Sequence, residues 1–108
     1  MKPAAAAFAA VSALLVCSAP AVADTEDQQF FSRLNALGFV VTDPALLRSQ
    51  GHMICNEGLR HGVSWGEMHG QLLQWGYSHS EASILGIAAI NSYCPQYSSV
   101  AAQIWSNY

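Results

Sequence analysis

Apolar residues recur at three- and four-residue spacing in four blocks along the chain from residue 25 onward. This period is typical of helices that bury one face, and no block shows the strict alternation of a half-buried strand. The blocks predict helices over about residues 25–37, 43–61, 65–75 and 79–94. The remaining residues 98–108 have the spacing for one further short helix.

Capping residues mark where these helices begin and end. Thr25, Ser64 and Ser78 each stand three residues before a Gln or Glu, which is the pattern of a capping box. Asp43 followed by Pro44 indicates the start of the second helix. The glycines after the first three blocks favour the left-handed backbone of a helix C-terminus; they are Gly38, Gly62 and Gly76.

The segment between Ser78 and Pro95 is apolar nearly all round, so we expect it to be the central and most buried helix. Five glycines fall inside predicted helices: Gly51, Gly58, Gly66, Gly70 and Gly86. Each costs about 0.8–1 kcal/mol of helix stability relative to alanine. They indicate weak helices, or close helix–helix approach, or both.

The first 23 residues have the three parts of a secretory signal peptide. Lys2 supplies a positive start, residues 4–16 form an apolar run, and residues 21–23 form a small-x-small cleavage site. We predict cleavage between Ala23 and Asp24 and a location outside the cell or in its envelope. The apolar run is shorter than the roughly 20 residues that span a membrane. Lipid anchoring through Cys17 is disfavoured because the bulky Val16 precedes it.

Two cysteines, Cys55 and Cys94, remain after removal of the signal peptide. An oxidising destination favours a disulfide, and two cysteines allow one intramolecular pairing. Closing a loop of about 40 residues contributes roughly 4 kcal/mol in the chain-entropy model. We therefore predict that this bond ties the second helix to the fourth, and that the reduced protein is only marginally stable.

These observations together predict an all-α fold with one disulfide. A single small domain of about four helices spans residues 24–95, and a C-terminal tail spans residues 96–108. The mature chain carries three arginines, no lysine and seven carboxylates, a net charge of −4 with the histidines neutral. Nucleic-acid binding needs a basic patch, so we expect no nucleic-acid partner. We also expect no transmembrane segment in the mature chain.

The four mature histidines are His52, His61, His69 and His79, and none forms an i, i+4 pair or an HExxH motif. The simplest interpretation places them at the surface and at helix ends. The alternative is a haem, metal or small-ligand carrier that uses His, Tyr and Met side chains, with His52, His69 and Tyr77 as candidate ligands. No cofactor is assigned to the chain on this pattern alone.

Catalytic motifs are absent from the sequence. There is no nucleophile elbow and no CxxC, and a bonded Cys55 would not be a nucleophile. The carboxylates are spread singly and suit helix N-termini, where negative charge is stabilising. We therefore predict that the protein is not an enzyme.

Several short stretches resemble one known family. They are Asp27 to Phe31 with Leu34 and Gly38, Gly51 to Cys55 with Leu59 and Gly62, and Tyr93-Cys94-Pro95. The chain resembles the small secreted actinobacterial family, mainly mycobacterial, that is catalogued as domain of unknown function 732. This resemblance implies export, a helical domain and a paired cysteine framework, and it implies no activity and no catalytic residues.

The sequence thus favours an exported, non-enzymatic interaction module that meets an unidentified protein or envelope partner. Val100, Ile104 and Trp105 on the predicted tail helix form a candidate contact surface, although the tail has the spacing to dock on its own core as well. The alternative function is the small-ligand, haem or metal carrier. Convergence of His52, His69 and Tyr77 on one cavity would favour that alternative.

Overall fold

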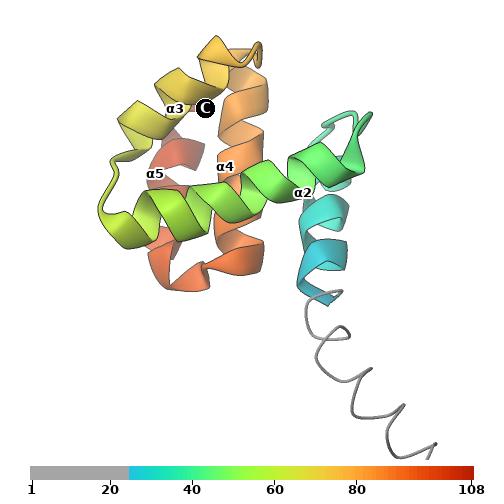
Figure 1. Cartoon of the computed structure of the whole chain (residues 1–108), viewed down its shortest axis with the longest axis horizontal. Helices are drawn as coiled ribbons and strands as arrows, with labels where there is room; N and C mark the ends of the chain where they lie inside the picture. Colours follow the sequence, from blue (N-terminus) through green and yellow to red (C-terminus); the bar gives the residue numbers. More distant parts are fainter. Residues whose placement is uncertain (1–24) are drawn as a thin grey trace, which may run out of the picture.

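The computed structural model describes residues 25–108, which fold as helices with no strand among them. The predicted all-α class is confirmed. In chain order the elements are a helix over residues 25–36, α2 (Pro44–Met53), a π-helical segment (Ile54–Gly58), a 3-10 turn (Leu59–His61), α3 (Trp65–Gln74), α4 (His79–Tyr93), a 3-10 turn (Pro95–Tyr97) and α5 (Ser98–Ser106) (Figure 1). The predicted signal peptide and its cleavage site between Ala23 and Asp24 lie outside the described residues.

The second predicted helix runs without a break over the expected residues, but its helix type changes along its length. The Asp43 carboxylate accepts a hydrogen bond from the Leu46 amide at 3.2 Å, and Pro44 occupies the first turn. The helix is α-helical to Met53, π-helical from Ile54 to Gly58 and 3-10 to His61. Gly62 then ends it with φ of 78°. A π segment inserts one extra residue per turn, a feature that often occurs at functional positions.

Two predicted capping residues act as expected, and one does not. The Ser78 hydroxyl accepts from the Glu81 amide, while the Glu81 carboxylate accepts from the Ser78 amide, so that α4 begins with a complete capping box. Ser64 accepts from the Glu67 amide at the start of α3. Thr25 is itself helical, so the prediction that it stands before the first helical residue is wrong.

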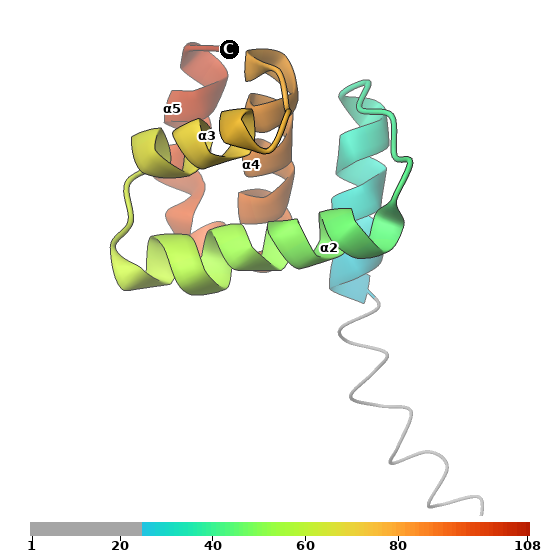
Figure 2. The same cartoon turned by 45° about the horizontal axis from the view of Figure 1, so that its top comes forward.

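Helix α4 is the centre of the domain, as the sequence predicts. It is buried continuously from Ala82 to Ile90. In both views it lies between α5 on one side and the helix of residues 25–36 on the other, and α2 crosses these elements at a steep angle (Figures 1 and 2). Helix α3 packs against α4 as well. No helix among residues 25–108 has the length and apolar character needed to cross a membrane.

Three of the helical glycines mark close approach between elements. A Cβ at Gly51 would stand 2.8 Å from the Phe30 ring, and one at Gly86 would stand 2.3 Å from the Trp65 ring. A Cβ at Gly58 would meet the side chain of Met68. Gly66 and Gly70 have no such neighbour, so those two glycines weaken α3 without permitting a contact.

The tail also takes part in the core. Within α5, Ala101 and Ile104 are buried, and α5 packs along α4. On the other side of the domain, Trp75, which the periodicity places on the inner stripe of the third helix, is 44% exposed. It follows the last turn of α3, where Gly76 turns the chain with φ of 102°.

Candidate functional site

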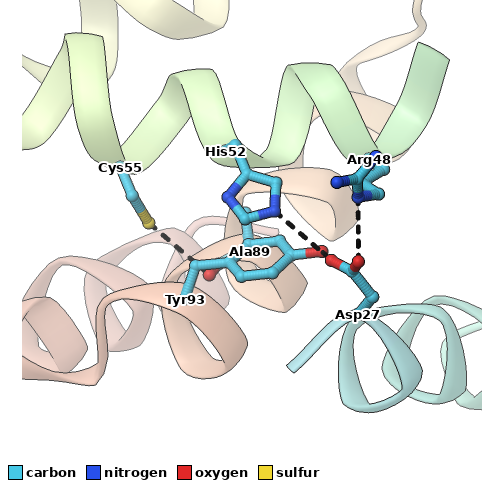
Figure 3. Close-up of polar contacts among 6 residues, drawn as sticks. All are labelled: Asp27, Arg48, His52, Cys55, Ala89 and Tyr93. Carbon is cyan, nitrogen blue, oxygen red and sulfur yellow. Dashed lines mark hydrogen bonds and ion pairs between the residues drawn. The ribbon is translucent and has the colours of Figure 1, made fainter. Parts of the chain in front are cut away.

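The disulfide between Cys55 and Cys94 is present, with an S–S distance of 2.05 Å. It joins the π-helical segment to the end of α4, and neither cysteine is accessible to solvent. The Cys55 Sγ lies 3.6 Å from the carbonyl oxygen of Ala89 (Figure 3). A disulfide sulfur carries no hydrogen, so this approach is a packing contact and not a hydrogen bond.

A cluster of polar side chains lies beside the disulfide, and we call it the Asp27 junction: Asp27, Arg48, His52 and Tyr93. The Tyr93 hydroxyl donates to Asp27 Oδ1 at 2.5 Å, and His52 Nε2 lies 3.3 Å from the same oxygen. Arg48 Nε donates to Asp27 Oδ2 at 2.8 Å. The junction therefore ties together three elements: the helix of residues 25–36, α2 and α4.

Local sequence explains how the junction forms. Arg48 and His52 on α2 and Cys55 in the π-helical segment follow one another at helical spacing, so they project from one face toward α4 and Asp27 (Figure 3). The His52 ring stacks on the Tyr93 ring with centroids 3.9 Å apart. Phe30, one turn after Asp27, also packs against the Tyr93 ring, with 5.1 Å between the ring centroids. The aromatic contacts hold Tyr93 where its hydroxyl meets the carboxylate.

The electrostatics of the junction favour an ionised Asp27. Partial burial alone would raise the pKa of this carboxyl, but the hydrogen bonds from Tyr93 and His52 and the charge of Arg48 outweigh it and hold the pKa below its ordinary value. Burial and the nearby Asp27 carboxylate raise the pKa of Tyr93 far above its ordinary range. Tyr93 therefore stays protonated and donates, and both carboxylate oxygens are engaged. This arrangement is suited to fastening helices together.

A second feature, which we call the α2–α3 cleft, lies where the π-helical segment faces α3. It has a volume of about 330 Å³. Two residues on its rim, Glu57 and Glu67, are exposed carboxylates, and no lysine or arginine lines it. Its lining is otherwise largely apolar: Gln50, Met53, Ile54, Gly58, Val63, Met68, Gln71, Leu72 and Trp75.

Gln50, a polar residue that lines the cleft, is hydrogen-bonded to Tyr77, which does not line it. The Tyr77 hydroxyl donates to Gln50 Oε1 at 2.5 Å, and Gln50 itself is buried. Burial, together with the carboxylates of Glu81 and Asp43, raises the pKa of Tyr77, so its hydroxyl remains a donor. The amide of Gln50 is thereby fixed in orientation at one end of the cleft.

The structure does not bring His52, His69 and Tyr77 to one cavity. His52 belongs to the Asp27 junction, His69 contacts His79, and Tyr77 contacts Gln50. None of the three lines the α2–α3 cleft. Within residues 25–108 no group of three or more His, Cys, Asp or Glu side chains is placed to hold a metal ion.

The three tail residues have different surroundings. Ile104 is 3% exposed and Val100 is partly buried against the core, whereas Trp105 is 55% exposed. Of the predicted contact surface, Trp105 alone therefore presents a large apolar area to solvent. Its ring lies 5.8 Å from that of Tyr108.

The structure thus defines a class of protein: a small, all-helical, disulfide-bonded domain with a polar junction and an open apolar cleft. The chain belongs to the family described as Protein of unknown function (DUF732), whose model matches residues 26–96. The match takes in the disulfide, the Asp27 junction and the cleft, while α5 lies beyond it.

The chain is also similar to uncharacterised mycobacterial proteins. One is from Mycobacterium tuberculosis (strain ATCC 25618 / H37Rv) and another from Mycobacterium bovis (strain ATCC BAA-935 / AF2122/97). Each is 26% identical over 92 residues, covering 84% of this chain and 80% of the relative. No solved structure matches the chain.

Proposed function

We propose that this protein is an exported, non-enzymatic interaction module of the cell envelope or extracellular space, and that it binds a protein partner through the α2–α3 cleft. The observation that carries the proposal is an apolar cleft that stays open between α2 with its π-helical continuation and α3, in a domain whose central helix α4 is buried from Ala82 to Ile90. Export is supported by the signal-like N-terminus and by the buried disulfide, a bond typical of oxidising compartments.

The chemistry of the cleft indicates the kind of partner. Two of its lining residues, Met53 and Met68, have flexible and polarisable side chains that adapt to different apolar groups. Glu57 and Glu67 supply negative charge at the rim with no basic residue to neutralise it. A partner segment that inserts one or two apolar side chains, flanked by lysine or arginine, is complementary in both respects.

The polar groups support a binding role over a catalytic one. Asp27 has both oxygens engaged by Tyr93, His52 and Arg48, and Tyr93 is held protonated. The two cysteines are bonded to each other and inaccessible. The side chains of the Asp27 junction and the two cysteines are thus committed to holding the fold.

Site-specific photo-crosslinking in the native host tests the proposal. Benzoyl-phenylalanine replaces Gln71, which is exposed and lines the cleft, or in a matched control Gln74, which is exposed on α3 outside the cleft. We expect an adduct of defined mass from position 71 that is absent from position 74 and weakened by the double substitution Glu57→Gln and Glu67→Gln. Equal adducts from both positions, or none from position 71, would refute a partner at the cleft.

A small-ligand carrier is the second candidate, and one observation favours it: the volume of the cleft falls at the lower end of the range found for small-ligand sites. Native mass spectrometry of the exported protein separates the two functions. A carrier shows a stoichiometric small-molecule adduct that disappears in Met68→Glu, whereas an interaction module has the mass of the mature chain alone. The same spectrum reports the cleavage site after Ala23 and the two-proton loss of the disulfide.

A further inference from the structure

A histidine pair joins the start of α4 to the middle of α3, away from the junction and outside the cleft. His69 Nε2 and His79 Nδ1 lie 2.9 Å apart, and the two ring centroids are 5.0 Å apart with 69° between the planes. His79 is exposed and His69 is half-buried. The two residues are ten positions apart in sequence, so their meeting depends on the packing of α3 against α4.

We infer that His69 and His79 form a binding site for a divalent transition-metal cation, with copper(II) as the preferred ion. Imidazole nitrogens bind such metals at about 2.0–2.1 Å. Two nitrogens at that distance from one ion are about 2.9 Å apart when they subtend 90°, and about 3.4 Å apart at the tetrahedral angle. The observed separation is that of a hydrogen bond between the two rings, and it also equals the spacing of adjacent corners in a square-planar or tetragonal site. An ion that replaces the shared proton with little change in this spacing would have that geometry, which is typical of copper(II) and nickel(II).

Copper(II) also stands highest in the Irving–Williams order for nitrogen ligands, so it is favoured over nickel(II) on affinity. Each ring needs to turn by about 45° so that both lone pairs meet the ion off the nitrogen–nitrogen line. His79 is exposed and His69 is half-buried, so most of the room for that rotation lies on the His79 side. Because no third His, Cys, Asp or Glu within residues 25–108 completes the set, water supplies the other corners.

The surroundings provide space, compensating charge and a reporter. His79 lies at the edge of a hollow of about 310 Å³ between α3, α4 and α5. The helix dipole puts partial positive charge at the N-terminus of α4, which weakens the binding of a cation at His79. The Glu81 carboxylate in the same turn offsets this effect. The Trp65 ring lies 5.9 Å from the His69 ring, close enough for a bound copper(II) ion to quench its fluorescence.

Copper(II) titration of the mature, disulfide-bonded protein tests the inference, with electron paramagnetic resonance and tryptophan fluorescence as readouts. We expect one site whose spectrum shows two equatorial imidazole nitrogens. His69→Gln and His79→Gln should each weaken it more than about a hundredfold, beyond the roughly 10–100-fold loss that removal of a mere supporting partner can produce. His61→Gln, at an exposed histidine in the 3-10 turn that precedes α3, is the matched control and should leave binding unchanged.

Circular dichroism establishes that each variant keeps its helical fold, and Trp65→Phe should remove most of the quenching while the site remains. Binding that survives in either His69→Gln or His79→Gln would overturn the inference. A spectrum with a single imidazole nitrogen, or no copper(II) uptake beyond that of the double variant, would overturn it as well.

Discussion

On the face of α2 that meets α4, the contacts are covalent, charged and aromatic, whereas the face that meets α3 leaves an open cleft. The first face holds the disulfide and the Asp27 junction, where Tyr93 is enclosed by Phe30 and His52. The second face presents Met53 to a cleft of about 330 Å³, and Met68 of α3 lines the same cleft from the opposite side. One helix therefore joins a fixed half of the domain to an adaptable half.

The difference shows how a chain of this size keeps an apolar cleft open without collapsing onto it. A small domain has little core to spare, and a cleft lined by apolar side chains favours closure. Fastening one face of α2 by a bond and by the Asp27 junction fixes where α2 lies, so that the other face stays open. The predictions below test this division between the two faces.

The largest expected effect comes from the disulfide. Replacing Cys55 and Cys94 together with alanine, or reducing the bond, should lower the free energy of unfolding by roughly 4 kcal/mol, because the bond closes a loop of about 40 residues. Chemical denaturation with and without reductant measures this loss. An unchanged midpoint would show that the fixed half does not depend on its covalent link.

The next largest effects should come from alanine substitutions at Gly51 and Gly58, which test the fixed half and the adaptable half of the domain separately. Gly51→Ala drives a methyl group against the rings of Phe30 and Tyr93 and should cost about 1–3 kcal/mol. Gly58→Ala meets the flexible Met68, which can swing into the cleft, so that its cost should be clearly smaller. Gly70→Ala is the reference: it has open space and should gain about 0.8–1 kcal/mol in helix stability. Denaturant midpoints measure all three.

Equal losses at Gly51 and Gly58 would contradict an adaptable α3 face. They would mean that Met68 is as firmly held as the aromatic rings on the opposite side of α2.

The smallest expected effect is a dependence on acid. The pKa of Asp27 is lower in the folded than in the unfolded protein, so its contribution to stability is complete above the unfolded value of about 4 and is lost as the pH falls through the folded pKa. Asp27→Asn should reduce stability at pH 7 and flatten this part of the pH profile. Glu57→Gln, at the rim of the cleft, should leave the profile unchanged. Unfolding free energies from pH 7 down to pH 2 provide the comparison.

Most helix boundaries could be predicted because they depend on neighbours in sequence. Asp43, Ser64 and Ser78 cap helices through bonds to residues three positions away, and Gly62 and Gly76 end helices through their own backbone. The disulfide could also be predicted from the sequence, since the two cysteines that follow the predicted signal peptide allow one pairing. The prediction failed at Trp75, because burial at the end of α3 depends on what lies opposite, and Trp75 lies at the open α2–α3 cleft, where it is 44% exposed.

The Asp27 junction and the π-helical segment could not be predicted in the same way. Tyr93 and Asp27 are 66 positions apart, and their hydrogen bond exists only because α2 crosses both of their helices. One signal was present: Asp27 lies one turn before Phe30 and Phe31, on the apolar face of its helix, where a carboxylate needs partners. The histidine pair gave no signal, since His69 and His79 belong to different helices.

The position of the disulfide divides the chain into a covalent ring and two open arms. The ring runs from Cys55 through α3 and α4 to Cys94, while the helix of residues 25–36 with α2 forms one arm and α5 forms the other. A protease that cuts the exposed turn at Gly62 or Gly76 leaves a single molecule with its two pieces still linked. A cut in either arm releases a fragment. A protein built in this way tolerates a cut in α3 or in the turns beside it better than a cut in either arm.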